Sequence, residues 1–124
     1  MTPSLYDRLG ASAGIAKLVD KLVELHLANP VVKQRFLPYL ESPERVAEIK
    51  RHSCAFLAMG TGGPAEYAGR SMPDTHRGMN ISDAEYMAVI DDILAAARAC
   101  GLGDDVQKDL LSIAWSLKGD IVRQ

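Results

Sequence analysis

Three histidines are the side chains in this sequence best suited to chemistry: His26, His52 and His76. A neutral imidazole can ligate a metal, and it gains or loses a proton near neutral pH. His76 lies in the run RSMPDTHRGMN, four residues after Met72, and Pro73 suits the first turn of a short helix. If that segment is helical, Met72 and His76 face one pocket. A partly exposed loop histidine is the simpler interpretation, so the spacing alone leaves both open.

Other reactive groups form no recognisable constellation. The sequence holds no nucleophile elbow, phosphate-binding loop, HExxH motif or paired carboxylate cluster. Cys54 and Cys100 make neither a CxxC pair nor a metal-ligand spacing, which predicts two reduced thiols in a cytoplasmic protein. Redox or gas chemistry in this chain would therefore need a cofactor.

Composition favours one globular domain over residues 1–124. Of the 124 residues, 48% are hydrophobic and 24% are charged, which suits a single packed core. The net charge is -2 without a basic stripe, which argues against a nucleic-acid partner. Asp7 and Arg8 stand where a signal peptide would be apolar, and no apolar run is long enough to cross a bilayer. We therefore expect a cytoplasmic protein without a membrane partner.

Helical periodicity predicts four long helices. They cover about residues 12–28, 43–59, 82–100 and 104–122. Ser12 and Ser42 are the expected N-caps of the first two helices, and Pro43 suits a first helical position. Ser82 and Glu85 form a capping box for the third helix.

Breaker residues separate these helices. Asn29-Pro30 ends the first helix, Gly60 to Pro64 stops the second, and Gly101 and Gly103 close the third. No alternating strand pattern of useful length appears. The helix over 82–100 is apolar over a wide arc, so it packs on more than one side. The expected class is therefore all-α, with crossing helices rather than an up-down bundle.

The middle of the chain resembles the central signature of group I truncated haemoglobins. That signature runs through FLAMGTGGPAEYAGRSMPDTHRGMNISDAEY, and the opening SLYDRLG is also similar to the family's start. The matching residues, in order, are Leu5, Tyr6, Leu9, Gly10, Gly62, Gly63, Pro64, Tyr67, Gly69, Met72, His76, Gly78, Ile81 and Tyr86. The resemblance covers nearly the whole chain, and an ordered set of this size is far more specific than a single motif.

The resemblance implies a two-over-two helical sandwich around one haem b. His76 would be the proximal iron ligand, and its second ring nitrogen would donate to a carbonyl. The residues expected to contact the haem are Phe36, Ile49, His52, Ser53, Phe56, Tyr67, Met72, Met79, Tyr86 and Val89. Lys50, Arg51 and Arg70 are candidates to pair with the haem propionates, or are plain surface residues.

The distal side departs from the common family pattern. Many relatives carry a Tyr that donates a hydrogen bond to bound oxygen, and Val23 stands at that position here. Counting back from FLAMGTGGP places Ile49 and Ser53 at two positions that often hold Gln or Leu. The expected pocket is mainly apolar, with Ser53 as its one small donor. A lost hydrogen bond of about 1.5–3 kcal/mol would make oxygen leave faster.

Two histidines on this side keep alternative roles. In some cyanobacterial relatives a His at the position of His52 reaches the iron and makes it six-coordinate. As the alternative, His52 is a surface residue that pairs with a propionate or with water. His26 lies three residues past Val23, and we expect a hydrogen-bonded core or pocket histidine rather than a ligand.

The expected function is reversible binding of oxygen, carbon monoxide or nitric oxide, as a carrier, store or sensor, by a monomer or weak homodimer. The alternative is a redox or nitric-oxide-detoxifying enzyme with a reductase partner, or a six-coordinate electron-transfer or sensor protein that uses His52. Without the resemblance, a four-helix interaction module would explain the periodicity equally well.

Overall fold

The computed structural model describes residues 3–63 and 71–124. The helices are α1 (Leu5–Arg8), α2 (Ala11–Ala28), α3 (Pro30–Lys33), the 3₁₀ helix η1 (Leu37–Tyr39), α4 (Pro43–Gly60), α5 (Met72–His76), α6 (Asp83–Ala99), α7 (Asp104–Ser116) and α8 (Lys118–Ile121). Among these described residues, extended pairing is limited to an isolated bridge between Ile81 and Val122. None of the helices in this part of the chain is long and apolar enough to cross a membrane. The all-α class is confirmed.

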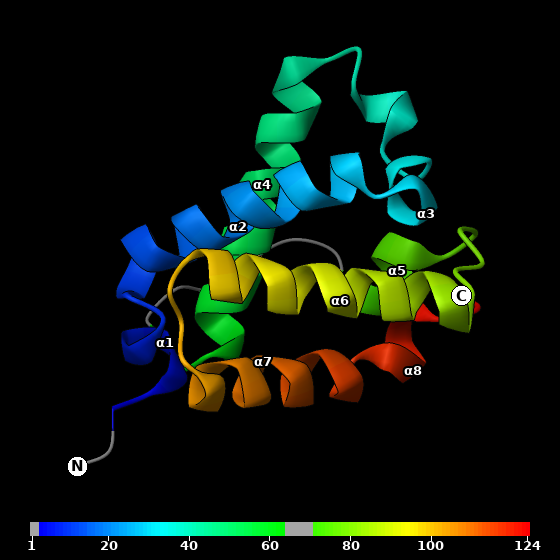
Figure 1. The fold of residues 1–124 in the computed structure, drawn as a ribbon. Helices are drawn as coiled ribbons and strands as arrows, with labels where there is room; N and C mark the ends of the chain where they lie inside the picture. The colour runs from blue at the N-terminus through cyan, green and yellow to red at the C-terminus, as the bar shows by residue number, and fades with distance from the viewer. Residues whose placement is uncertain (1–2, 64–70) are drawn as a thin grey trace.

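Two helix pairs form the body of the fold, α2 with α4 and α6 with α7. Figure 1 shows α2, α6 and α7 one below another, with α4 crossing behind them. Helix α2 packs against both α4 and α6, and α6 packs against α7. The short helices α5 and α8 contact each other at the end of the molecule that carries the C-terminus. This is the two-over-two sandwich that the family resemblance implies, and it agrees with the crossing helices that the apolar pattern predicts.

Most predicted helix boundaries are confirmed by cap geometry. Ser42 caps α4, and Pro43 stands in its first turn. The capping box of α6 is complete, because Ser82 and Glu85 each accept a hydrogen bond from the other's backbone. Asn29 ends α2, and its side chain then caps α3 by accepting from the Val31 N–H.

The predicted cap of the first long helix is wrong. Helix α2 begins at Ala11, and its N-cap is Gly10, whose φ of 96° is left-handed, rather than Ser12. The chain turns so tightly here that a Cβ on Gly14 would lie 1.9 Å from the Leu9 carbonyl oxygen. Only glycine tolerates these positions, so a tight backbone turn replaces the serine side-chain cap.

The predicted helix over 104–122 is in fact two helices. It breaks at Leu117, whose N–H is shared between the carbonyls of Ile113, at 3.2 Å, and Ala114, at 3.3 Å. After α8 the chain pairs with the segment that follows α5, where the Arg123 N–H donates to the Ile81 carbonyl at 2.8 Å. The apolar spacing is the same for a continuous and a broken helix, so periodicity could not reveal this break.

The core consists of two hydrophobic clusters. The first joins α2 with one end of α6 and the start of α7, and its buried members are Leu9, Ile15, Leu18, Val19, Val23, Ala58, Ala96, Ala97, Val106 and Leu110. The second contains Ile81, Tyr86, Ile90, Ala114 and Ile121. Partly buried Ile93 packs against both clusters. Within α4, all of which is described, Ala58 is the one buried residue.

Candidate haem site

His76 is the last residue of α5, and local sequence builds that helix. The Ser71 side chain caps it by accepting from the Asp74 N–H at 3.2 Å, and Pro73 occupies its first turn. The segment is therefore a short helix, for which Pro73 is suited, and the condition for Met72 and His76 to face one pocket is met. His76 is half-buried at the end of this helix.

One hydrogen bond determines how the His76 ring can act. Its Nδ1 lies 2.8 Å from the Met72 carbonyl oxygen. Because a carbonyl only accepts, we assign the ring hydrogen to Nδ1. Nε2 then carries the lone pair, in the tautomer that a metal-binding imidazole uses, with its other nitrogen donating to an acceptor. His76 is thus prepared as a single nitrogen ligand.

The segment that follows His76 is fixed by the C-terminal tail. The N–H groups of Gly78 and Asn80 both donate to the Gln124 carbonyl oxygen, at 3.2 and 3.0 Å. The Met79 N–H donates to the His76 carbonyl at 3.0 Å. These backbone hydrogen bonds therefore limit the movement of the loop that follows His76 in the sequence.

The residues predicted beside His76 lie around the second core cluster. Met72 and Met79 are partly buried and pack against this cluster. Tyr86 is a member of it, only 4% exposed, and its hydroxyl donates to the Ala114 carbonyl. Burial raises the pKa of the Tyr86 hydroxyl. Its contact with a haem stays a prediction. Tyr67 lies outside the described residues, as does Arg70.

Helix α4 carries half-buried residues predicted to contact the haem. Ile49, Ser53 and Phe56 recur at helical spacing and are all half-buried. Other residues of α4 pack on the first cluster, namely Val46, Cys54, Leu57 and Ala58. In the described part of the chain, neither cluster includes Ile49 or Phe56, nor Val89 of α6. Half-buried apolar side chains outside the packed core are the surface that a flat apolar cofactor would cover.

Three polar residues of α4 predicted at the haem, Lys50, Arg51 and His52, lie at least partly at the protein surface. The His52 side chain is 53% exposed, and its Nε2 lies 3.6 Å from the Glu48 carboxylate. Lys50 pairs with Asp20 of α2 at 3.1 Å. His52 would have to leave Glu48 to reach a cofactor, so its role as a ligand remains a prediction. Val23, at the position of the family's Tyr, is buried in the first cluster.

His26 forms a buried polar network, as expected of a hydrogen-bonded core histidine. Its Nδ1 lies 2.7 Å from Asp92, and the Asn29 side chain donates to both Asp92 oxygens at 3.2 Å. The His26 ring also stacks on Phe36, with 5.7 Å between ring centroids. Burial lowers the pKa of His26 more than Asp92 raises it. His26 is therefore a neutral donor that orients Phe36, a predicted haem contact.

Sequence reasoning missed the partners Asp92 and Asn29. A signal was present, because Asp92 stands between Val89 and Ala96 within the apolar arc of α6. A carboxylate in such an arc needs a buried hydrogen-bond donor. Nothing in the spacing of residues identifies His26 as that donor.

The donor set fits a haem better than a bare metal ion. In the described residues, no group of three or more His, Cys, Asp or Glu side chains gathers to hold a metal. A haem iron needs only an axial ligand from the protein, because the porphyrin supplies the nitrogens of its plane. One imidazole nitrogen beside half-buried apolar side chains meets that requirement.

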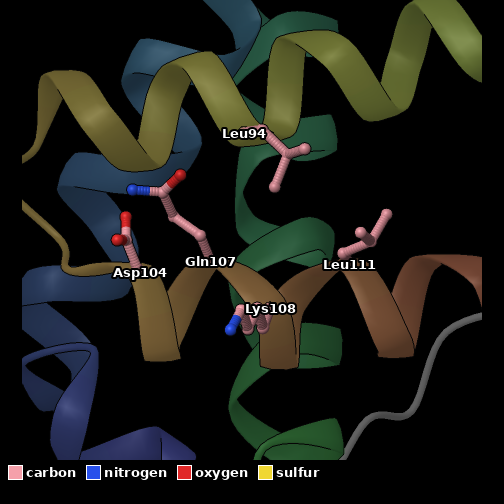
Figure 2. Close-up of a pocket in the computed structure, with 5 residues that line it drawn as sticks. All are labelled: Leu94, Asp104, Gln107, Lys108 and Leu111. Atoms are coloured by element: carbon pink, nitrogen blue, oxygen red, sulfur yellow. The ribbon is translucent and has the colours of Figure 1, made fainter.

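A separate shallow pocket of about 230 Å³ lies between α6 and α7, lined by Leu94, Asp104, Gln107, Lys108 and Leu111. Figure 2 shows Leu94 pointing from α6 toward α7, which carries the other lining residues. None of the predicted site residues lines this pocket.

Comparisons with known proteins identify the family to which this chain belongs. The family model for bacterial-like globins matches residues 4–122. The group 1 truncated hemoglobin GlbN of Nostoc sp. (strain MUN 8820) is 28% identical over 121 residues, which cover 98% of each chain.

Solved structures show the same fold. The truncated hemoglobin of Tetrahymena pyriformis, in its Fe(III) form, superposes with a TM-score of 0.88 at 24% identity, over 98% of this chain and 100% of the other. The 2/2 hemoglobin of Synechococcus sp. PCC 7002, in the cyanomet state with covalently attached heme, gives 0.84 at 23% identity, over 97% and 98%. At these identities the likeness concerns the fold alone.

Proposed function

Because this chain belongs to the bacterial-like globin family, we propose that it binds one haem b, with His76 as the proximal iron ligand, and reversibly binds a diatomic gas. The observation that carries the proposal is the hydrogen bond from His76 Nδ1 to the Met72 carbonyl oxygen, 2.8 Å long. With the ring hydrogen on Nδ1, Nε2 of this half-buried ring carries the lone pair, which is the form that ligates iron.

The other residues of the site supply apolar contact and exclude water. Met72 and Met79 stand on the His76 side, against the second cluster. Ile49 and Phe56 offer the half-buried face of α4, and Phe36 is oriented by its stack on His26. When bound, the haem supplies an iron atom at which a diatomic ligand can bind. A low-polarity surround also keeps the charged haem propionates toward water.

The proposed gas pocket is weakly polar. Val23 and Ile49 carry no hydrogen-bond donor, and the Ser53 hydroxyl is the small donor on the α4 face. Such a pocket stabilises a polar bound gas less than a pocket with a Tyr hydroxyl would, by about 1.5–3 kcal/mol of hydrogen-bond energy. We therefore propose weak retention of oxygen and a smaller effect on carbon monoxide.

Absorption spectra of the purified protein test the proposal. After reconstitution with haem, the ferric, ferrous and carbon monoxide forms should give three distinct spectra, with one haem per chain. Release of oxygen on rapid mixing should be fast. A protein that stays colourless after reconstitution contradicts haem binding. A ferric spectrum that changes in His52→Ala would assign His52 to the iron as well.

A further inference from the structure

Arg35 joins three segments that are distant in the sequence. It lies between α3 and η1, next to Phe36. Its Nε and Nη2 donate to the two carboxylate oxygens of Glu85, at 2.6 and 2.8 Å. Its Nη1 donates to the Met79 carbonyl oxygen at 2.7 Å. We call these three residues the Arg35 clamp. One planar guanidinium therefore ties the Phe36 segment to α6 and to the loop after His76.

Glu85 is held firmly enough to anchor this clamp. Its Oε1 also accepts from the Ser82 N–H at 3.2 Å, and its own N–H donates to the Ser82 hydroxyl at 3.1 Å. The hydrogen bonds from Arg35 are the main reason that the pKa of Glu85 falls to about 2. The carboxylate is thus ionised at any physiological pH. A two-point bond between a guanidinium and a carboxylate also fixes the direction of both groups.

The third hydrogen bond of the clamp, from Arg35 to the Met79 carbonyl, reaches the loop after His76. Met79 donates its N–H to the His76 carbonyl at 3.0 Å, while its own carbonyl accepts from Arg35. On either side of it, Gly78 and Asn80 are bonded to Gln124. The loop is therefore held by Arg35 through one residue and by the C-terminal tail through its neighbours.

We propose that Arg35 is a positioning residue that ties the Phe36 segment to the loop after His76 and thereby slows the loss of haem. The inference rests on the proposed function, because it takes Phe36 and His76 as haem contacts. If both segments contact the haem, its release requires them to move apart. This movement breaks the three charge-assisted hydrogen bonds that Arg35 makes. These bonds already exist before haem binds, so the clamp slows haem loss without adding a step to haem uptake.

Haem transfer to an excess of an apoglobin acceptor measures this directly. Arg35→Gln should lose haem about tenfold faster than the wild-type protein, since it removes the charge from these bonds. Arg35→Lys should lie between them, because an ammonium cannot make the two-point bond to Glu85. The matched control is Arg8→Gln. It breaks a comparable half-exposed ion pair, with Asp109, that joins α1 to α7. The control should match the wild-type rate.

A second measurement does not depend on haem chemistry. Amide hydrogen exchange in the same proteins should speed up at Gly78 and Asn80 in Arg35→Gln, and not in Arg8→Gln. If the wild-type protein holds haem and Arg35→Gln loses it no faster than Arg8→Gln, the role proposed for the Arg35 clamp is wrong and the proposed function stands. If the wild-type protein takes up no haem, the proposed function and the retention role both fail. Should Arg35→Gln not fold, Arg35→Lys carries the same comparison.

Discussion

The buried His26 ring links the stability of the protein to pH. An unfolded histidine has a pKa of about 6.5, and burial lowers the folded value despite the Asp92 carboxylate. Between these two values the unfolded chain binds more protons than the folded protein. The free energy of unfolding is therefore highest above the unfolded pKa and falls as the pH drops below about 6.5, until the folded pKa is reached.

The variant His26→Gln should remove this pH dependence. Glutamine can still donate to Asp92 but does not titrate, so its unfolding free energy should change less between about pH 7.5 and about pH 5. Urea unfolding of both proteins across that range measures the difference. If the two curves run parallel, His26 does not carry the effect.

Val23 is the residue where the gas affinity should be easiest to change. Val23→Tyr brings a hydroxyl to the position where many relatives carry one. If it donates to oxygen in the pocket, release should slow by about tenfold or more, from about 1.5–3 kcal/mol of added hydrogen bonding. Val23→Phe is the matched control, because it adds the same bulk to a buried position without the hydroxyl. Stopped-flow oxygen release compares them, and equal rates for Tyr and Phe would refute a donor role.

The candidate site could be predicted as far as its signals are local. The His76 bond to Met72 spans four residues, and Pro73 and Ser71 specify the short helix that makes it. The partners of the other polar groups are remote. Asp92 is 66 positions from His26, and Glu85 is 50 from Arg35. Such pairs depend on how whole helices pack, which no spacing within one segment encodes.

At the scale of elements, α5 is short enough that its cap matters to function. Ser71→Ala removes the bond to the Asp74 N–H and should cost about 1 kcal/mol of stability. Because His76 closes this helix, haem loss should also become several-fold faster. Ser42→Ala removes the equivalent cap of α4 and should cost similar stability with a smaller change in haem loss. Denaturant unfolding and haem transfer of both variants test this. The same rate of haem loss in both would contradict a specific role for α5.

Some helix boundaries are set by residues close in the sequence, and others by residues far away in it. Ser42, Ser82 and Asn29 cap their helices because side chain and backbone lie within a few residues of each other. The break at Leu117 instead accompanies a tail that pairs with Ile81, far away in the sequence. Helix identity was therefore predictable, whereas the division into α7 and α8 needed the tertiary fold.

For the whole molecule, the division of the core into two clusters predicts a strong effect of the cofactor on stability. Ile49 and Val89 are half-buried and belong to neither cluster among the described residues, so a haem would bury apolar surface that still reaches solvent. A ligand that binds only the folded state stabilises it in proportion to its affinity. Removing the haem should therefore lower the Tm clearly and weaken hydrogen-exchange protection first in α4 and α5. Equal Tm values with and without haem would contradict the placement of the site.

We propose that the His76 imidazole is the ligand through which this chain binds its haem iron. Resonance Raman spectra of the ferrous protein report the iron–histidine stretching band. We expect the band in the wild-type protein, its loss together with most haem binding in His76→Gly, and recovery of haem binding when free imidazole is added. His52→Ala, which removes the other candidate ligand, should keep the band. A His76→Gly protein that binds haem with an unchanged spectrum would contradict the account.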